Sequence, residues 1–176
     1  MEEPPTGVLD DAFAHHHWAT GRVLDALDSL DAGALHTTAV GVYGSILDTM
    51  RHLVSADRGY LVALTHSAID PVDTDDADVA TLRAVSDASA AAWAGVLASD
   101  PDADEVITRP RRDGGEIRVR AGVLWAQALH HGTDHRSQVC TVLTVAGVEP
   151  PAIDAWAYAV VRGRLEVVEP GGLTDG

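Results

Sequence analysis

The sequence predicts an all-α protein: a four-helix bundle with a small β-hairpin before the fourth main helix and a short C-terminal helix. Three observations predict this class. Four long segments repeat apolar residues at intervals of three and four, which places those residues on one face of a helix. One short stretch is instead β-branched and flanks an Asp-Gly pair, which is typical of a hairpin. The 176 residues, 46 % of them apolar, suffice for one domain, and we expect 1–176 to form it with its core in 8–165.

The first three helices follow from this apolar rhythm. The first is expected over 8–31 and the second over 45–66, with Ser45 as its N-cap. Residues 67–77 hold a proline and many aspartates, so they predict a loop. The third helix is expected over 77–98, and its many alanines permit close packing.

The second half of the chain opens with the hairpin. Two β-branched runs within 105–120 flank the Asp-Gly turn. The fourth main helix is expected over 121–147, ending at Gly147 as a C-terminal cap. After a Pro-Pro pair, a last helix should begin near Asp154 and reach about 165.

Composition excludes several classes of function. The net charge of −15 would repel a phosphate backbone, which argues against nucleic-acid binding. Apolar runs fall far short of a membrane span, and the acidic N-terminus has neither the basic nor the apolar region of a secretion signal. Cys140 is the one cysteine, so no internal disulfide forms, and a reducing cytoplasm is the expected location.

Two histidines stand on the apolar stripe of the fourth helix. His131 and His135 are four residues apart, so they share a face, and both occupy positions where leucine is expected. A buried imidazole without a partner is costly, and one metal ion would satisfy both rings. The alternative is two core histidines bonded to backbone or water. Gly132 follows the first histidine where zinc peptidases carry glutamate, which argues against that class.

The second helix supplies a candidate third ligand, His52, beside the core residue Leu53. The alternative for this residue alone is an ordinary half-buried histidine. Asp57 lies five residues later on the same buried stripe, where a carboxylate needs a partner. A hydrogen bond to a metal-bound histidine or water would explain it. The alternative is an ion pair with Arg136 or Arg22.

The remaining histidines are weaker candidates. Three consecutive histidines on the first helix point about 100° apart and cannot share an ion. Of these, His16 alone falls on the apolar stripe and is expected to line the site, while His15 and His17 are expected to be solvated. Cys140, about 140° round the helix from His135, is expected to serve as a small buried hydrophobe.

The segment LHHGTDHRSQVCTVLTVAGVEPPAIDAWAYA resembles the signature of the DinB/YfiT-like metalloprotein superfamily. The matching positions of this segment are His131, His135, Arg136, Gln138, Gly147, Pro150, Pro151 and Asp154. His52 and Asp57 match a His and an acidic residue of the family's second helix. On the first helix Trp18 and Arg22 match, while His16 stands where the family usually has Asn; Ser137 replaces a common glycine.

The resemblance implies a four-helix bundle with a three-histidine site for zinc or sometimes nickel, often in a homodimer. Some relatives are thiol S-transferases that use bacillithiol or mycothiol, and others isomerise maleylpyruvate with mycothiol. We therefore expect a metal-dependent transferase that joins a low-molecular-weight thiol, such as mycothiol, to a small electrophile.

In this interpretation each predicted site residue has a role. His52, His131 and His135 bind the metal, Asp57 orients a ligand or shuttles a proton, and the helix-one face near His16 and Trp18 lines the substrate pocket. A metal-dependent hydrolase with Asp57 as general base is one alternative. A non-catalytic metal-binding or stress-related protein is the other.

Overall fold

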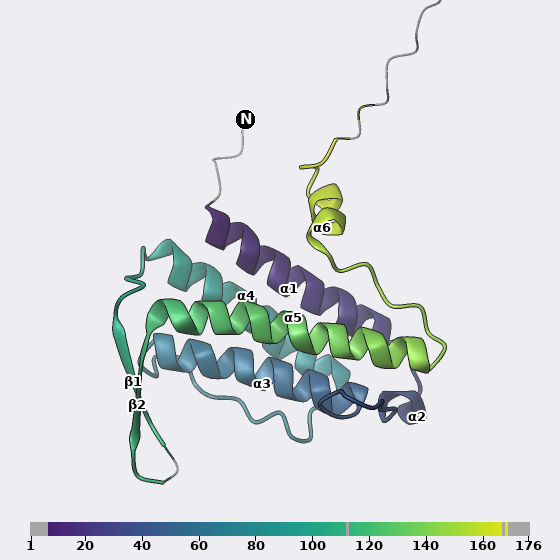
Figure 1. Ribbon diagram of the computed structural model, residues 1–176, viewed down its shortest axis with the longest axis horizontal. Helices are drawn as coiled ribbons and strands as arrows, with labels where there is room; N and C mark the ends of the chain where they lie inside the picture. Colours follow the sequence, from purple (N-terminus) through teal and green to yellow (C-terminus); the bar gives the residue numbers. More distant parts are fainter. Residues whose placement is uncertain (1–6, 112, 167, 169–176) are drawn as a thin grey trace, which may run out of the picture.

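The computed structural model describes residues 7–111, 113–166 and 168. Four long helices form the expected bundle: α1 (Val8–Leu27), α3 (Ile46–Leu64), α4 (Val79–Ala98) and α5 (Ala121–Val145). Helices α1 and α3 each pack against both α4 and α5, so they lie on one diagonal of the bundle (Figure 1). The all-α prediction is confirmed.

Helices α3 and α4 run in the same direction, because the connection between them returns along the bundle (Figure 1). Side-chain to backbone hydrogen bonds hold this connection against α3. Arg58 Nε donates to the carbonyl of Asp70, and Arg51 Nε donates to that of Ala77. The connection therefore runs back along α3, from near Arg58 to near Arg51, before α4 begins.

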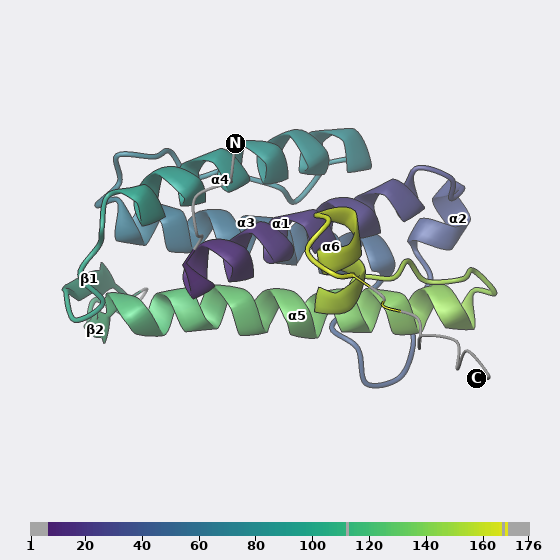
Figure 2. The ribbon, with the colours of Figure 1, turned by 90° about the horizontal axis from the view of Figure 1, so that it is seen from above.

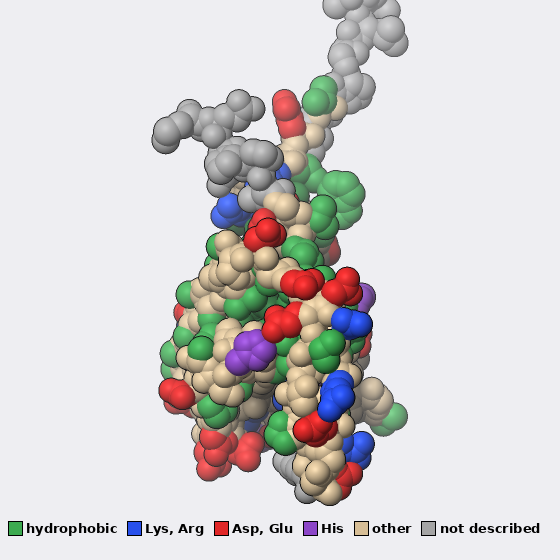
Figure 3. Space-filling model, turned by 90° about the vertical axis from the view of Figure 1, so that its left-hand side faces the viewer, with side chains coloured by type: hydrophobic (Ala, Val, Ile, Leu, Met, Phe, Trp, Pro, Cys, Tyr) green, Lys and Arg blue, Asp and Glu red, His purple; other side chains and the backbone are tan. Residues whose placement is uncertain are grey.

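The hairpin and the C-terminal helix are also present. Strands β1 (Val106–Pro110) and β2 (Glu116–Arg120) pair antiparallel, and Gly114 in the predicted turn has a φ of +84°. They project from one end of the bundle, where acidic and basic side chains share the surface (Figure 3). Helix α6 (Ala155–Val161) lies over α1 (Figure 2), capped by the Asp154 side chain.

The first helix begins at Val8 as predicted, but its C-terminal end differs from the prediction. Helix α1 stops at Leu27 instead of 31, and a short helix α2 (Ala32–Leu35) follows. The side chain of Asp31 accepts from the backbone N–H of Ala34, so it caps a new helix instead of continuing the old one. Ser45 caps α3 and Gly147 adopts a φ of +76° after α5, both as predicted. Helix α6 ends at Val161, short of 165.

The core consists of two apolar clusters at different heights along the bundle. The α2-end cluster holds the buried residues Val23, Leu24, Leu27, Ile46, Leu47, Met50, Leu53, Val54, Ala77, Leu82, Val139, Val142 and Leu143. The hairpin-end cluster holds Phe13, Leu61, Trp93, Ile107, Ala121, Leu124, Trp125 and Ala128. Between them all four long helices place buried polar residues: His16, Thr20, Asp57, Ser86, Ser89 and Arg136. We call these six residues the polar layer.

Within the described residues, no helix combines the length and the apolar character needed to cross a membrane.

Candidate metal centre

The three histidines predicted as ligands meet between α3 and α5. Nε2 of His131 lies 3.1 Å from Nε2 of His52 and 3.1 Å from Nε2 of His135. One ring nitrogen from each residue lies within 4.8 Å of the other two. With Zn–N bonds of about 2.0–2.1 Å, a tetrahedral ion holds its nitrogens about 3.3 Å apart. The spacing of the three rings therefore fits a single ion.

Gln138 fixes which nitrogen of His135 carries hydrogen. Its Oε1 accepts from the backbone N–H of Tyr43 at 3.0 Å, so the oxygen of the amide, not its nitrogen, faces this side. The same Oε1 lies 3.1 Å from Nδ1 of His135, which must then be the donor. Nε2 of His135 keeps its lone pair toward His131, the arrangement that a metal ligand requires.

The local environment keeps the rings of His131 and His52 neutral. Burial lowers the pKa of His131 to about 4, and repulsion from His135 and His52 adds to the shift. Burial, followed by repulsion from His135, also lowers the pKa of His52. Neutral imidazole is the form that binds metals, so both rings are ready to coordinate at neutral pH.

Tyr43 and a small cavity flank the cluster. The Tyr43 ring stacks on that of His52, with centroids 4.2 Å apart and planes 15° apart, and meets His135 edge-on at 5.3 Å. A cavity of about 240 Å³ shares Tyr43 and His52 with the cluster. Its remaining walls come from Asp48, Arg51, Ser55, Thr74 and Asp75. A small molecule therefore has room beside one of the candidate ligands.

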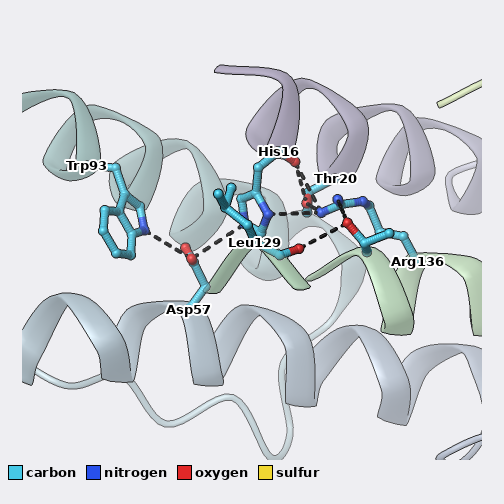
Figure 4. A network of polar contacts seen from close by, with 7 residues as sticks. His16, Thr20, Asp57, Trp93, Leu129 and Arg136 are labelled. Carbon is cyan, nitrogen blue, oxygen red and sulfur yellow. Dashed lines mark hydrogen bonds and ion pairs between the residues drawn. The ribbon is translucent and has the colours of Figure 1, made fainter. Parts of the chain in front are cut away.

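Asp57 is buried, as its position on the stripe predicted, but its partners differ from those expected. Its Oδ1 accepts from Trp93 Nε1 at 3.0 Å and lies 3.5 Å from His16 Nε2 (Figure 4). Neither Arg136 nor Arg22 is within ion-pair distance of it among the described residues. Sequence reasoning missed Trp93 as this partner; its indole N–H, which needs an acceptor when buried, was the available signal.

Arg136 sets the hydrogen positions in the polar layer. Its NH1 donates to Thr20 Oγ1 at 3.1 Å and to His16 Nδ1 at 3.2 Å (Figure 4). A guanidinium only donates, so Nδ1 of His16 accepts and Nε2 carries the hydrogen, directed at Asp57. Burial lowers the pKa of His16, which keeps the ring neutral. His16 thus bridges a buried cation and a buried carboxylate.

A second group, His16, His17 and Asp57, also has its ligand atoms within 4.8 Å of one another. The hydrogen on Nε2 of His16 occupies the position that a metal ion would need. This group is therefore better explained as part of the hydrogen-bonded layer than as a second metal site.

His16 and Trp18 point to different neighbours. His16 faces the bundle interior, whereas Trp18 packs against Tyr158 of α6, with ring centroids 5.4 Å apart. The two side chains therefore lie on different sides of α1, because residues two apart on a helix point about 200° apart.

The expectation that His15 and His17 are solvated is wrong. His15 is half-buried, and its Nε2 lies 2.8 Å from the carbonyl of Ile153, to which it donates. His17 Nε2 is enclosed without a partner among the described residues, and burial lowers the pKa of His17 to about 4. Helix α1 packs against α4, α5 and α6, so more than its apolar stripe is covered.

The model of the DinB family matches residues 5–166, nearly the whole chain. Among curated proteins, none matches the sequence. The matched range includes the four long helices, the hairpin, all three converging histidines and the polar layer. The chain therefore belongs to the DinB family.

Proposed function

We propose that the chain binds one divalent metal ion through His52, His131 and His135 and is a metal-dependent enzyme. The observation that carries this proposal is the convergence of three ring nitrogens, with 3.1 Å separations to His131 Nε2. Gln138 supports it by holding the hydrogen of His135 on Nδ1. Zinc is the first candidate and nickel the second, because imidazole ligands suit both.

The proposed reaction is transfer of a low-molecular-weight thiol, mycothiol or a similar one, to a small electrophile. A divalent ion held by three neutral imidazoles supplies Lewis acidity that lowers the pKa of a thiol. The cavity at His52 gives the substrate a place, with Tyr43 as an aromatic wall and the Arg51 guanidinium beside it. Its 240 Å³ lies below the roughly 300–1,000 Å³ of sites for drug-sized ligands, which favours a small electrophile.

Hydrolysis has less support. It would need a general base near the ion, and Asp57 was the candidate. Its carboxylate instead accepts from Trp93 and faces the Nε2–H of His16. A purely structural metal site is also less favoured, because a cavity lies beside His52.

Elemental analysis of protein purified without added metal tests metal binding. We expect about one equivalent of a divalent metal in the wild type and loss of most of it in His131→Ala. His130→Ala, at the neighbouring exposed position on α5, is the matched control and should keep its metal. Equal metal content in all three proteins would contradict the site.

Thiol transfer is tested separately. The metal-loaded protein should accelerate the reaction of mycothiol or another thiol with monochlorobimane, and a chelator or His131→Ala should abolish the acceleration. Metal bound in stoichiometric amount without acceleration for any thiol would leave the metal site standing and reject the transferase.

A further inference from the structure

A second cavity lies where α1, α5 and the segment before α6 meet. Its volume of about 560 Å³ is more than twice that of the cavity at His52. Its walls are mainly apolar and come from His15 of α1, from Arg136, Ser137 and Cys140 of α5, and from residues 150–155. This size falls in the range of small-molecule sites, and none of the three candidate metal ligands lines it.

The wall opposite α5 is held in place at two points. His15 Nε2 donates to the carbonyl of Ile153 at 2.8 Å, which ties the segment to α1. The Asp154 side chain accepts from the backbone N–H groups of Trp156 and Ala157, so this carboxylate is committed to capping α6. The cavity is therefore a formed part of the fold.

Arg136 is a buried cation in this wall with only 2 % of its surface exposed. All its hydrogen bonds go to uncharged acceptors: His16, Thr20 and Thr133. Within the described residues no carboxylate lies within 4.0 Å of it. A buried charge without a direct counter-ion is costly, so the guanidinium is suited to receive an anion.

Unused hydrogens remain on Nε and NH2 of Arg136. NH1 serves three acceptors and NH2 serves Thr133 at 3.3 Å, whereas Nε and one hydrogen of NH2 have no acceptor among the described residues. Nε is not fully enclosed, although the arginine as a whole is buried. The Nε–NH2 edge of arginine matches the two oxygens of a carboxylate.

We propose that this cavity binds a small monocarboxylate with an apolar body. The carboxylate pairs with the Nε–NH2 edge of Arg136, and the body packs against Pro150, Pro151 and Ile153. This site is separate from the proposed metal centre, and its ligand would give Arg136 the direct counter-ion that no described residue provides.

The single cysteine makes the site measurable, because Cys140 lines the cavity and alkylation of the whole chain reports on it alone. The probes are octanoate and octanamide, which share an apolar body and differ in charge. We expect saturating octanoate to slow the reaction of Cys140 with iodoacetamide at least fivefold. Octanamide should need at least tenfold higher concentration for the same protection.

Equal protection by both probes would overturn the role of Arg136, and no protection by either would overturn the site.

Arg136→Gln should bring the two probes to equal potency, but it also removes hydrogen bonds of the polar layer. Ser137→Trp therefore provides a second variant, since it fills the cavity from an exposed position on α5. Calorimetry should show loss of octanoate binding in Ser137→Trp and wild-type binding in Asp134→Trp, an exposed position outside the cavity. Metal content should not change in either, and octanoate binding retained by Ser137→Trp would overturn the proposal.

Discussion

The imidazole of His16 lies directly against the backbone of α5 at Gly132. A β-carbon at position 132 would stand 2.3 Å from Cε1 and 2.6 Å from Nδ1 of His16, closer than non-bonded atoms approach. From the sequence, Gly132 served only to exclude the glutamate of a zinc peptidase. The structure gives it a role of its own, because glycine at this position lets a side chain of α1 reach the centre of the polar layer.

We expect Gly132→Ala to lower the free energy of unfolding by about 1–3 kcal/mol, because the added methyl displaces His16. This loss should appear although alanine favours a helix by about 1 kcal/mol over glycine. The control is Gly95→Ala in α4, where a β-carbon meets nothing within 4 Å. Chemical denaturation should show stabilisation of the control, and stabilisation of both variants would contradict the close contact.

Gln138→Leu should weaken metal binding about 10–100-fold, because it removes the acceptor that holds hydrogen on Nδ1 of His135. Competition with a chelator measures the affinity. Gln127→Leu, at an exposed position on the same helix, should bind metal as the wild type does. Unchanged affinity in Gln138→Leu would mean that the amide does not set the state of the ring.

The apo protein should lose stability as the pH falls from about 6.5 to 4. Burial lowers the pKa of His17 from 6.5 to about 4, so in this window the unfolded chain binds a proton that the folded chain does not. At about 1.4 kcal/mol per pKa unit, His17 contributes a loss of up to about 3 kcal/mol by the acid end of the window.

Urea unfolding at pH 7, 5.5 and 4.5 measures this loss. His17→Gln removes the titrating ring and should flatten the pH dependence, whereas His130→Gln, at an exposed position on α5, should leave it unchanged. An equally steep loss in His17→Gln would place the acid sensitivity in other groups.

Asp57→Asn should lower the free energy of unfolding by about 2–4 kcal/mol while metal content at pH 7 stays near that of the wild type. The substitution removes the charge that faces His16 and accepts from Trp93, and it leaves Arg136 without the carboxylate that His16 links to it. Asp87→Asn, on the exposed side of α4, is the control for denaturation. A variant with wild-type stability but no metal-dependent turnover would instead make Asp57 a catalytic residue.

The sequence predicted the helices well, because the spacing of apolar residues records which side of each helix is buried. The same spacing identified His131 and His135 as candidate ligands, because their polar rings interrupt an apolar stripe. Helix α2 was missed because it spans only Ala32–Leu35, too short for any periodicity to appear.

The pairing of buried polar groups could not be predicted in the same way. His16 and Asp57 were both identified as buried, but their contact depends on how α1 and α3 are rotated and how far each is displaced along the bundle. The hydrogen bonds of Arg136 were even harder to predict, because its long side chain reaches across from α5 to α1. The burial of His17 was underestimated, because an apolar stripe indicates only one buried face of a helix and α1 is covered on more than one.

The polar layer between the two apolar clusters has a consequence for how the helices align. An apolar core alone tolerates a helix that slides by one turn, about 5.4 Å, since leucine can replace leucine against the neighbouring helix. Sliding α1 or α5 by that distance would separate His16 from Arg136 and leave a guanidinium facing hydrocarbon. The layer therefore selects one axial alignment of the four helices, and the same alignment sets the height at which His52 meets His131.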